Sequence, residues 1–543
     1  MRHLFVFIAA CSAPAPPPVQ PPAPRPPLPV AVPAPDAAPM PPPPGLRGAS
    51  CSVEHACAEG LRCGPLPGGY CISACGATGT ACDGACVETA RAGELCMKSC
   101  TSDADCRASE GYTCDPVWHA CALPNFAAIV PKQCPASGPA RDASFGASEQ
   151  LSDVSSPGVY QFEPSAVVGD DGSTTAMFIT RGSIFDGNAL GVAQAGGANT
   201  RVAVKSAKQS HFDPWLARDA KGTLYAVWYG FDGRDQNGEI ALSKSTDRGA
   251  TWSEPVAVHD PADCAEPEGE CLDKPMIAIG PMPRGVRGEA IYVMYAAEGG
   301  GLRVRGSHDG GATWGKPVTA LAGIYGNAAV GADGRLHVVT LNGGPMGAFG
   351  SAQQTVEYTV SADGGASFAK ATRVSAPDEM IPFFFSNPSI AIDSRRGWLY
   401  VAYARGGRDA VWDVVLAATR DGGKTWLRKP LGDGCALHMV PNLAVDPSTG
   451  ILHVAYYDSA GGGRYTHAAC AVGLAKCTVG GAINDKPFGA VSTERHGSKW
   501  IGEYESLVVD DKRHVLHAVW TQPVAEAGGK VIARIFSATA KLR

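Results

Sequence analysis

One eight-residue pattern, present four times, limits this chain to a repeat architecture. The pattern is S/T-x-D-x-G-x-T/S-W/F, at residues 245–252, 307–314, 361–368 and 419–426, and its aspartates lie 62, 54 and 58 positions apart. In each copy the carboxylate can accept backbone N–H bonds, the glycine allows a positive φ, and the aromatic side chain is expected to pack the turn on its own sheet. We therefore interpret the pattern as a structural turn without catalytic chemistry. Its marker residues are Asp247, Gly249, Trp252, Asp309, Gly311, Trp314, Asp363, Gly365, Phe368, Asp421, Gly423 and Trp426.

A second repeat runs in step with these turns and counts the structural units. Its copies begin an apolar strand at residues 163–167, 213–217, 274–278, 327–330, 387–391, 440–444 and 504–508, at spacings of 50 to 64 residues. No segment beyond Cys134 has a convincing helical period, so this part is expected to be all-β. Seven copies predict seven four-stranded blades, each with its inner strand first and the turn pattern between the third and outer strands.

The repeated turn resembles the Asp-box of sialidases and related propellers, and the resemblance covers most of residues 143–543. It implies a seven-bladed Asp-box β-propeller with a sialidase-like fold. The last unit ends after residues 531–536 without a turn pattern or an outer strand. Residues 143–152 align with residues 366–375, which hold a turn aromatic and the outer strand that follows it. We therefore expect the N-terminal segment to complete the last blade and cover its open edge.

The chain divides into four expected regions. Residues 1–11 hold a short apolar run, too short to span a bilayer, that ends in Ile-Ala-Ala-Cys and resembles a bacterial lipobox. This resemblance implies an outer-membrane lipoprotein lipidated at Cys11, with plain secretion as the alternative. Residues 12–50 form a Pro/Ala-rich disordered linker. Residues 51–134 are a cysteine-rich disulfide module and residues 135–543 the propeller, so the protein is expected outside the cytoplasm.

Twelve cysteines between positions 51 and 121 dominate the second folded region. So small and apolar-poor a segment needs cross-links, and six disulfides would supply them, although the connectivity cannot be deduced from the sequence. A zinc site would need C-x2-C pairs, which the spacings do not provide. The segment around Cys106 and Cys114 resembles small modules that precede secreted bacterial propellers, which implies export.

The propeller region has six further cysteines. Cys264 and Cys271 share the spacing of Cys470 and Cys477, and both loops are expected to be locally bridged. The second pair lies where the sixth unit lacks its turn pattern. By elimination, Cys134 would pair with Cys435.

The charge pattern excludes some partners. The net charge is −6 with acids and bases interspersed, so no basic stripe supports nucleic-acid binding. We expect no cofactor and no catalytic metal. The acidic stretches 232–237 and 263–273 could hold Ca²⁺, but neither has EF-hand spacing, and solvated loops are the favoured interpretation.

The sialidase resemblance also implies candidate catalytic residues. Sialidases open their first blade with F/Y-R-I-P, whose Arg binds the substrate carboxylate, but this chain has Phe162 in the Arg place, and Phe cannot replace a guanidinium fork. Arg181 and Asp186 follow the second strand of blade one, where the family keeps a binding Arg and an acid/base Asp. Residues 504–507 resemble the segment with the nucleophilic Tyr. Tyr504 would then be the nucleophile and Glu505 its partner.

Two functions remain open. The favoured one is a monomeric secreted or surface-anchored propeller that binds an extracellular glycan or protein at its mouth, touching membranes only through a lipid anchor. The alternative is a retaining, exo-acting sialidase-like glycosidase, which the missing Arg and the seven units, where sialidases have six, both disfavour. One polar residue per inner strand would line the mouth or merely cap strand ends. These residues are Glu163, Asp213, Lys274, Asn327, Asn387, Tyr504 and Glu505.

Overall fold

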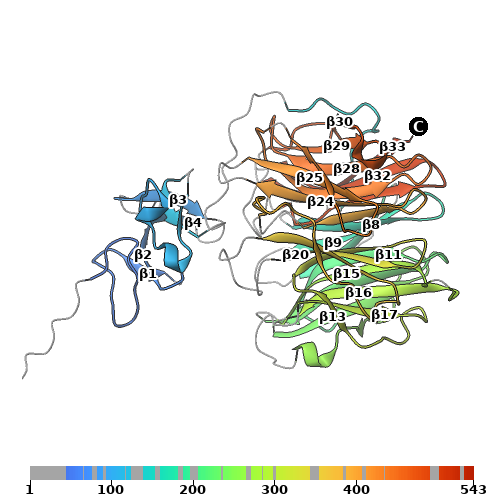
Figure 1. The fold of residues 1–543 in the computed structure, drawn as a ribbon, viewed down its shortest axis with the longest axis horizontal. Helices are drawn as coiled ribbons and strands as arrows, with labels where there is room; N and C mark the ends of the chain where they lie inside the picture. The colour runs from blue at the N-terminus through green and yellow to red at the C-terminus, as the bar shows by residue number, and fades with distance from the viewer. Residues whose placement is uncertain are drawn as a thin grey trace, which may run out of the picture. The chain divides into compact units, whose positions relative to one another are not determined.

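The computed structural model is an all-β protein. It describes residues 44–542 apart from positions 65, 76–81, 90–92, 116–117, 124–137, 153–158, 182–187, 196–205, 234–235, 265–270, 284, 298–300, 343–353, 383–386, 407–410, 433, 490–500 and 526–530. Figure 1 shows a small part that holds β1–β6 and a large part that holds the later strands. In the described residues, no helix is long and apolar enough to cross a membrane.

The large part consists of seven antiparallel sheets, numbered here as blades in chain order. Blade one contains β8 (Tyr160–Val168), β9 (Thr174–Arg181) and β10 (Asn188–Gln194); blade two contains β11 (Ser210–Arg218), β12 (Leu224–Asp232), β13 (Gln236–Ser245) and β14 (Val256–Ala257); blade three contains β15 (Leu272–Pro281), β16 (Glu289–Ala297), β17 (Gly301–Ser307) and β18 (Val318–Leu321). Blade four contains β19 (Tyr325–Val330), β20 (Leu336–Asn342), β21 (Thr355–Ser361) and β22 (Thr372–Arg373); blade five contains β23 (Ser389–Asp393), β24 (Trp398–Gly406), β25 (Trp412–Thr419) and β26 (Leu427–Leu431). Blade six contains β27 (His438–Val445), β28 (Leu452–Asp458), β29 (Arg464–Cys470) and β30 (Cys477–Ala482); blade seven contains β31 (Ser506–Asp510), β32 (Val515–Ala525), β33 (Val531–Lys541) and, from the N-terminal side, β7 (Glu149–Gln150).

The first strands of the blades form a closed ring. Each of β8, β11, β15, β19, β23, β27 and β31 contacts the next, and β31 returns to β8. Within each blade the strands follow one another in sheet order, so the chain runs outward from the ring centre. The predicted seven-bladed β-propeller is therefore confirmed, with three strands of blade one in the described part of the chain.

The hydrophobic core lies between the blades. In β24, Val401 and Tyr403 pack toward blade four, whereas Tyr400 and Ala402 pack toward blade six. Side chains of a strand alternate between the two faces of its sheet, and here both faces are covered. This is why the strand reads as a continuous apolar run in the sequence.

The repeated turns have the expected internal hydrogen bonds. In the turn after β17, Ser307 Oγ and Thr313 N donate to Asp309 Oδ1 over 2.8 and 2.9 Å, and Gly311 N donates to Ser307 Oγ. The aromatic residue differs from the expectation. Trp426 of blade five packs edge-on against Tyr358 of blade four, with ring centroids 5.6 Å apart, so it joins two sheets and does not only cover its own. The reason is that the turn itself leans on the preceding blade.

A glycine makes that close approach possible. Gly423 has a φ of 85°, and a Cβ at this position would lie 2.5 Å from Tyr358 Cδ1. Any other residue would therefore meet both a left-handed backbone and a clash. Blade six has no such turn, and a disulfide between Cys470 and Cys477 joins the ends of β29 and β30 there.

The N-terminal segment supplies the outer strand of blade seven. Gln150 pairs with Phe536 in β33, and Leu151 N donates to Ile535 O over 2.8 Å. Just before this, Arg141 forms a parallel bridge with Ala482 in blade six. The segment thus crosses from one blade to the next and covers the edge of β33.

The small part is held together by disulfides. Its strands are β1 (Arg62–Gly64), β2 (Tyr70–Ala74), β3 (Ala85–Thr89), β4 (Gly93–Met97), β5 (Thr113–Asp115) and β6 (Ala120–Ala122), and its 3₁₀ turns are η2 (Asp103–Asp105) and η3 (Ala108–Glu110). Six disulfides join Cys51 to Cys63, Cys57 to Cys71, Cys75 to Cys86, Cys82 to Cys96, Cys100 to Cys114 and Cys106 to Cys121. In the propeller, Cys264 of η4 (Pro261–Cys264) is bonded to Cys271, and η5 (Val472–Leu474) lies inside the Cys470–Cys477 loop. Cys435 is disulfide-bonded, while Cys134 and Cys11 lie outside the described residues.

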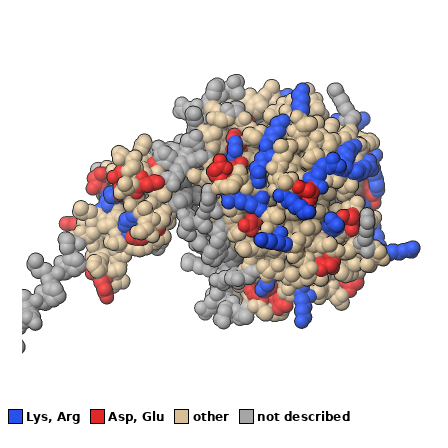
Figure 2. All heavy atoms as spheres, in the orientation of Figure 1, with Lys and Arg blue, Asp and Glu red and all other residues tan. Residues whose placement is uncertain are grey.

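The surface carries charges of both signs. Figure 2 shows Lys and Arg side chains on the visible face of the propeller with Asp and Glu side chains between them. Some of these groups are ion pairs, among them Arg218 and Lys512 with Asp170. Such exposed pairs contribute little to stability because water screens them.

Removing the N-terminal strand should open the ring. A chain that begins at Gly138 keeps β7, whereas one that begins at Pro157 lacks it and leaves the edge of β33 unpaired. We expect the first to unfold in one cooperative transition in urea and the second to lose cooperativity or aggregate. If the shorter chain stays monomeric and unfolds as cooperatively as the longer one, β7 is not required for closure.

Candidate functional site

Four inner strands share an unusual backbone kink near their start. Glu163, Asp213, Lys274 and Val440 have φ values of 58°, 51°, 47° and 52°, and a proline follows each of them. The pairing with the second strand shifts register at each of these places. A positive φ is uncommon for residues other than glycine and costs on the order of 1–3 kcal/mol. The fold accepts this strain at the same point in four blades, which marks the ring centre as a candidate site.

Three of the kinked residues and one neighbour form a buried charge cluster, hereafter the axial cluster: Glu163, Asp213, Lys274 and Glu503. The Lys274 Nζ lies 2.6 Å from Asp213 Oδ1 and 2.7 Å from Glu503 Oε2, and these side chains are 9%, 5% and 2% exposed. Glu503 N donates to Glu163 Oε1 over 3.2 Å. These residues belong to blades one, two and three and to the segment before β31, so they meet at the centre of the ring.

The protonation states of the axial cluster follow from burial and mutual charge. Burial raises the pKa of Glu163 well above its ordinary value, and although Lys274 opposes this, Asp213 and Glu503 add to it. Burial alone would lower the pKa of Lys274, but the carboxylates of Asp213, Glu503 and Glu163 outweigh it and raise that pKa. The cluster therefore holds a charged ammonium and a neutral Glu163 at neutral pH.

Aromatic rings surround the axial cluster. The rings of Trp215 and Tyr504 lie 5.0 Å apart, and the Lys274 Nζ is 5.6 Å from the centroid of the Tyr325 ring. The Tyr504 hydroxyl donates to the Pro214 carbonyl over 3.1 Å. Tyr504 thus ties blade seven to blade two across the ring centre.

The environment of Tyr504 does not suit a nucleophile. Burial raises its pKa well above the ordinary value, and the carboxylates of Glu163 and Asp213 raise it further. A nucleophilic hydroxyl needs a neighbouring base that accepts its proton or a lowered pKa. The hydroxyl of Tyr504 instead donates to a backbone carbonyl.

The predicted partnership between Tyr504 and Glu505 is wrong. Glu505 accepts a hydrogen bond from the Tyr457 hydroxyl and another from Thr521 N over 3.0 Å. Because side chains alternate along the chain, two consecutive residues turn to different neighbours, and Glu505 enters the interface of blades six and seven. Burial raises the pKa of Glu505 well above its ordinary value.

The remaining predicted site residues divide into three groups. Arg181 ends β9, where it pairs across the sheet with Tyr160, and its Nε is buried without a hydrogen-bond partner among the described residues. Asn327 lies in β19 and Asn387 just before β23, and in the described part of the chain neither joins the axial cluster. Asp186 lies outside the described residues.

Glu503 is the residue that the sequence analysis missed. The repeat alignment places Tyr504 opposite Glu163, and the seventh unit has no proline at this place to mark the kink. Its acidic side chain beside an inner strand is the one available signal. The Phe162 side chain, in the place of the sialidase Arg, is fully buried and stacks on Tyr160 at 5.9 Å.

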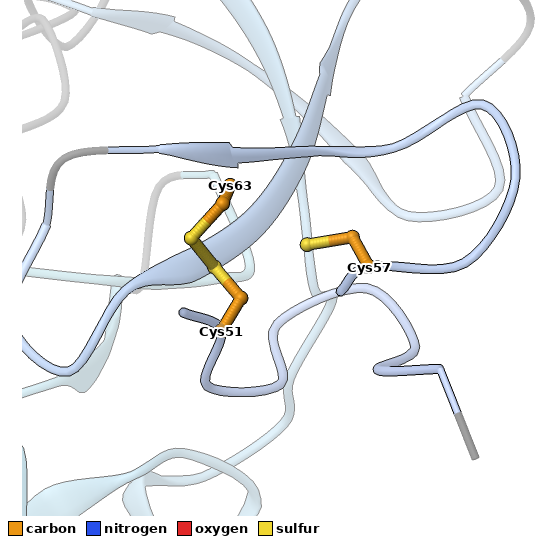
Figure 3. Close-up of side chains that lie close together, drawn as sticks. All are labelled: Cys51, Cys57 and Cys63. Atoms are coloured by element: carbon orange, nitrogen blue, oxygen red, sulfur yellow. A yellow bond between two sulfur atoms is a disulfide. The ribbon is translucent and has the colours of Figure 1, made fainter. Parts of the chain in front are cut away.

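The groups that could suggest a metal are already occupied. The Asp263 carboxylate accepts hydrogen bonds from Tyr295 and Arg303, and Asp232 pairs with Lys208, within the two acidic stretches considered for Ca²⁺. Cys51, Cys57 and Cys63 bring three sulfur atoms together, and Figure 3 shows the bond between Cys51 and Cys63. Cys57 is bonded to Cys71, so these sulfur atoms are not free thiolates.

Comparisons with known proteins agree on the fold alone. No protein-family model and no curated protein matches the chain. A protein of unknown function from Dyadobacter fermentans is 14% identical, with a TM-score of 0.42, over 74% of this chain and 99% of that chain. A Hadza microbial sialidase is 16% identical, with a TM-score of 0.40, over 67% and 73%. The NanB sialidase from Streptococcus pneumoniae is 11% identical, with a TM-score of 0.41, over 58% and 67%. At this similarity no residue's role passes from those proteins to this chain.

Breaking the axial cluster should destabilise the propeller strongly. Lys274→Met leaves Asp213 and Glu503 as buried carboxylates without their cation, which typically costs about 3–5 kcal/mol. We expect a loss of that size in the free energy of unfolding, measured in urea. Lys512→Met removes a cation from the exposed pair with Asp170 and is the control, expected to leave stability nearly unchanged. Equal effects of the two substitutions would show that the axial cluster is not a structural centre.

Proposed function

We propose that this protein binds an extracellular glycan at the mouth of its propeller and does not cleave it. The observation that carries the proposal is the convergence of Glu163, Asp213 and Lys274 from three strained kinks onto one point at the ring centre. Backbone strain of this kind persists only where the surrounding structure holds it, and it concentrates at functional sites. The axial cluster then serves as the rigid floor of the mouth.

The chemistry around the mouth suits hydroxyl-rich ligands. Carboxylates accept hydrogen bonds from hydroxyl groups, and the half-buried Trp215 ring beside Tyr504 offers an apolar surface for the C–H face of a sugar ring. The axial cluster has three carboxyl groups and one ammonium, so an anionic sugar gains no free cation from it. A neutral saccharide is the ligand class that this chemistry favours.

Three features weigh against a sialidase-type reaction. The place of the substrate Arg holds the buried Phe162, the hydroxyl of Tyr504 has no carboxylate partner that takes its proton, and Glu505 is bonded to Tyr457. A glycosidase of this type needs a nucleophile and an acid/base in reach of one sugar. The binding function therefore needs fewer assumptions than hydrolysis.

Export belongs to the same proposal. Eight disulfides in the described residues are typical of proteins that fold in an oxidising compartment. We propose that the chain is secreted or anchored at Cys11 and that the linker and the disulfide module hold the propeller away from the surface. Glycans would be available there.

A glycan array, followed by calorimetry on any hit, tests the binding function. We expect retention of neutral saccharides, and Trp215→Ala should weaken binding by about tenfold, or roughly 1.4 kcal/mol, because it removes an aromatic contact surface. Trp398→Ala is the control, since Trp398 pairs with Asp393 at the opposite end of the inner strand of blade five. Turnover of a fluorogenic sialoside should equal the buffer rate. Hydrolysis that Tyr504→Phe abolishes would establish the glycosidase instead.

A further inference from the structure

The seam where the N-terminal segment joins blades six and seven contains a chain of buried titratable groups. The Asp142 Oδ2 lies 2.8 Å from His467 Nδ1, and His467 Nε2 lies 3.1 Å from His453 Nδ1. The three side chains come from the N-terminal segment, β29 and β28, and all three residues are less than a tenth exposed. We call them the seam relay.

The hydrogen-bonding pattern assigns the protons of the seam relay. Asp142 as a carboxylate accepts from His467 Nδ1–H, so His467 Nε2 is free to accept from His453 Nδ1–H. Both imidazoles are then neutral. The His453 Nε2 is left as a buried acceptor with no partner in the described part of the chain.

Acid has to break this arrangement. A proton added at His453 Nε2 would have no acceptor there, and a proton added at His467 Nε2 would remove the bond between the two rings. The surroundings offer little compensation: the aromatic edge of Phe145 lies 5.2 Å from the His467 ring, and the other charged group that acts on His453 is Asp446. Arg141 directs its guanidinium to backbone carbonyls and to Asp485.

The backbone of the closing segment depends on the same residues. Asp142 N donates to Ala482 O over 2.8 Å, and Asp142 Oδ1 accepts from Ser144 N and Ser144 Oγ over 2.9 and 2.6 Å. Three residues further on, Gly146 N donates to Thr539 O in blade seven. Asp142 is therefore the residue at which the seam relay and the closing segment meet.

We propose that Asp142, His467 and His453 form an acid-sensitive clasp, in which proton uptake by the histidines loosens the N-terminal segment and opens the propeller between blades six and seven. The device differs in place and in chemistry from the ligand-binding mouth. Its consequence is that acidification weakens one seam of the ring before it weakens the others.

The direction of the pH effect follows from the shifts. Burial and the neighbouring His467 lower the pKa of His453 from 6.5 to about 4. Burial would raise the pKa of Asp142, but the hydrogen bonds from His467 and Ser144 outweigh it and hold the pKa below its ordinary value. The open seam therefore binds more protons than the closed one, so closure is complete above pH 6.5 and weakens as the pH falls toward 4.

Hydrogen exchange of the full-length protein tests the clasp. Protection factors of the amides of Asp142, Gly146 and Leu151 are measured between pH 7.5 and 4.5 against amides in β16 and β17 of blade three. We expect the seam amides to lose at least tenfold in protection relative to the reference across this range. In His453→Gln, which removes the titrating ring, that relative loss should disappear.

His337→Gln is the matched control. His337 is also a histidine whose pKa burial lowers to about 4, but it bonds to Tyr358 in blade four, away from the seam. It should retain the wild-type profile of the seam amides. If His453→Gln does not fold, Asp142→Asn replaces it and should lower seam protection already at pH 7.5. A seam profile that is flat in the wild type, or unchanged in the variant that folds, contradicts the clasp.

Discussion

The ammonium of Lys274 is the group around which the centre of this propeller is organised. Moving one ion from water into a protein interior costs several kcal/mol, and the cost is recovered only with close, well-directed partners. Asp213 and Glu503 supply them at 2.6 and 2.7 Å. Because these partners come from other blades, Lys274 can be buried only when blades two, three and seven are all in register.

The sequence predicted the fold because each level of the pattern agreed with the next. The repeated turns and the inner-strand repeat gave seven units, and residues 143–152 matched an outer strand. The kinks at Glu163, Asp213 and Lys274 were also foreseeable as one ring of positions, since each precedes a proline. What the sequence could not supply was direction. Only the pairing of strands shows that Glu505 turns to Tyr457 and that Glu503 turns to Lys274.

The site illustrates how a fold common to several enzyme types can hold polar residues without catalysis. The axial cluster satisfies its own charges, and the hydroxyl of Tyr504 is used to tie blade two to blade seven. A reacting group must instead be available to a substrate and have a pKa near the working pH. Here burial moves the pKa values of Glu163, Tyr504 and Lys274 away from neutrality, because the groups stabilise one another. That favours a rigid binding surface.

A structure that locates hydrogen atoms would test the central claim most directly. Neutron diffraction from crystals of the propeller at pH 7 should show three deuterons on the Lys274 Nζ, directed between Asp213 and Glu503, and one deuteron on the Glu163 carboxyl group. A Lys274 side chain that points into water, or a Glu163 carboxylate without a deuteron, would contradict the account of a self-neutralised cluster at the ring centre.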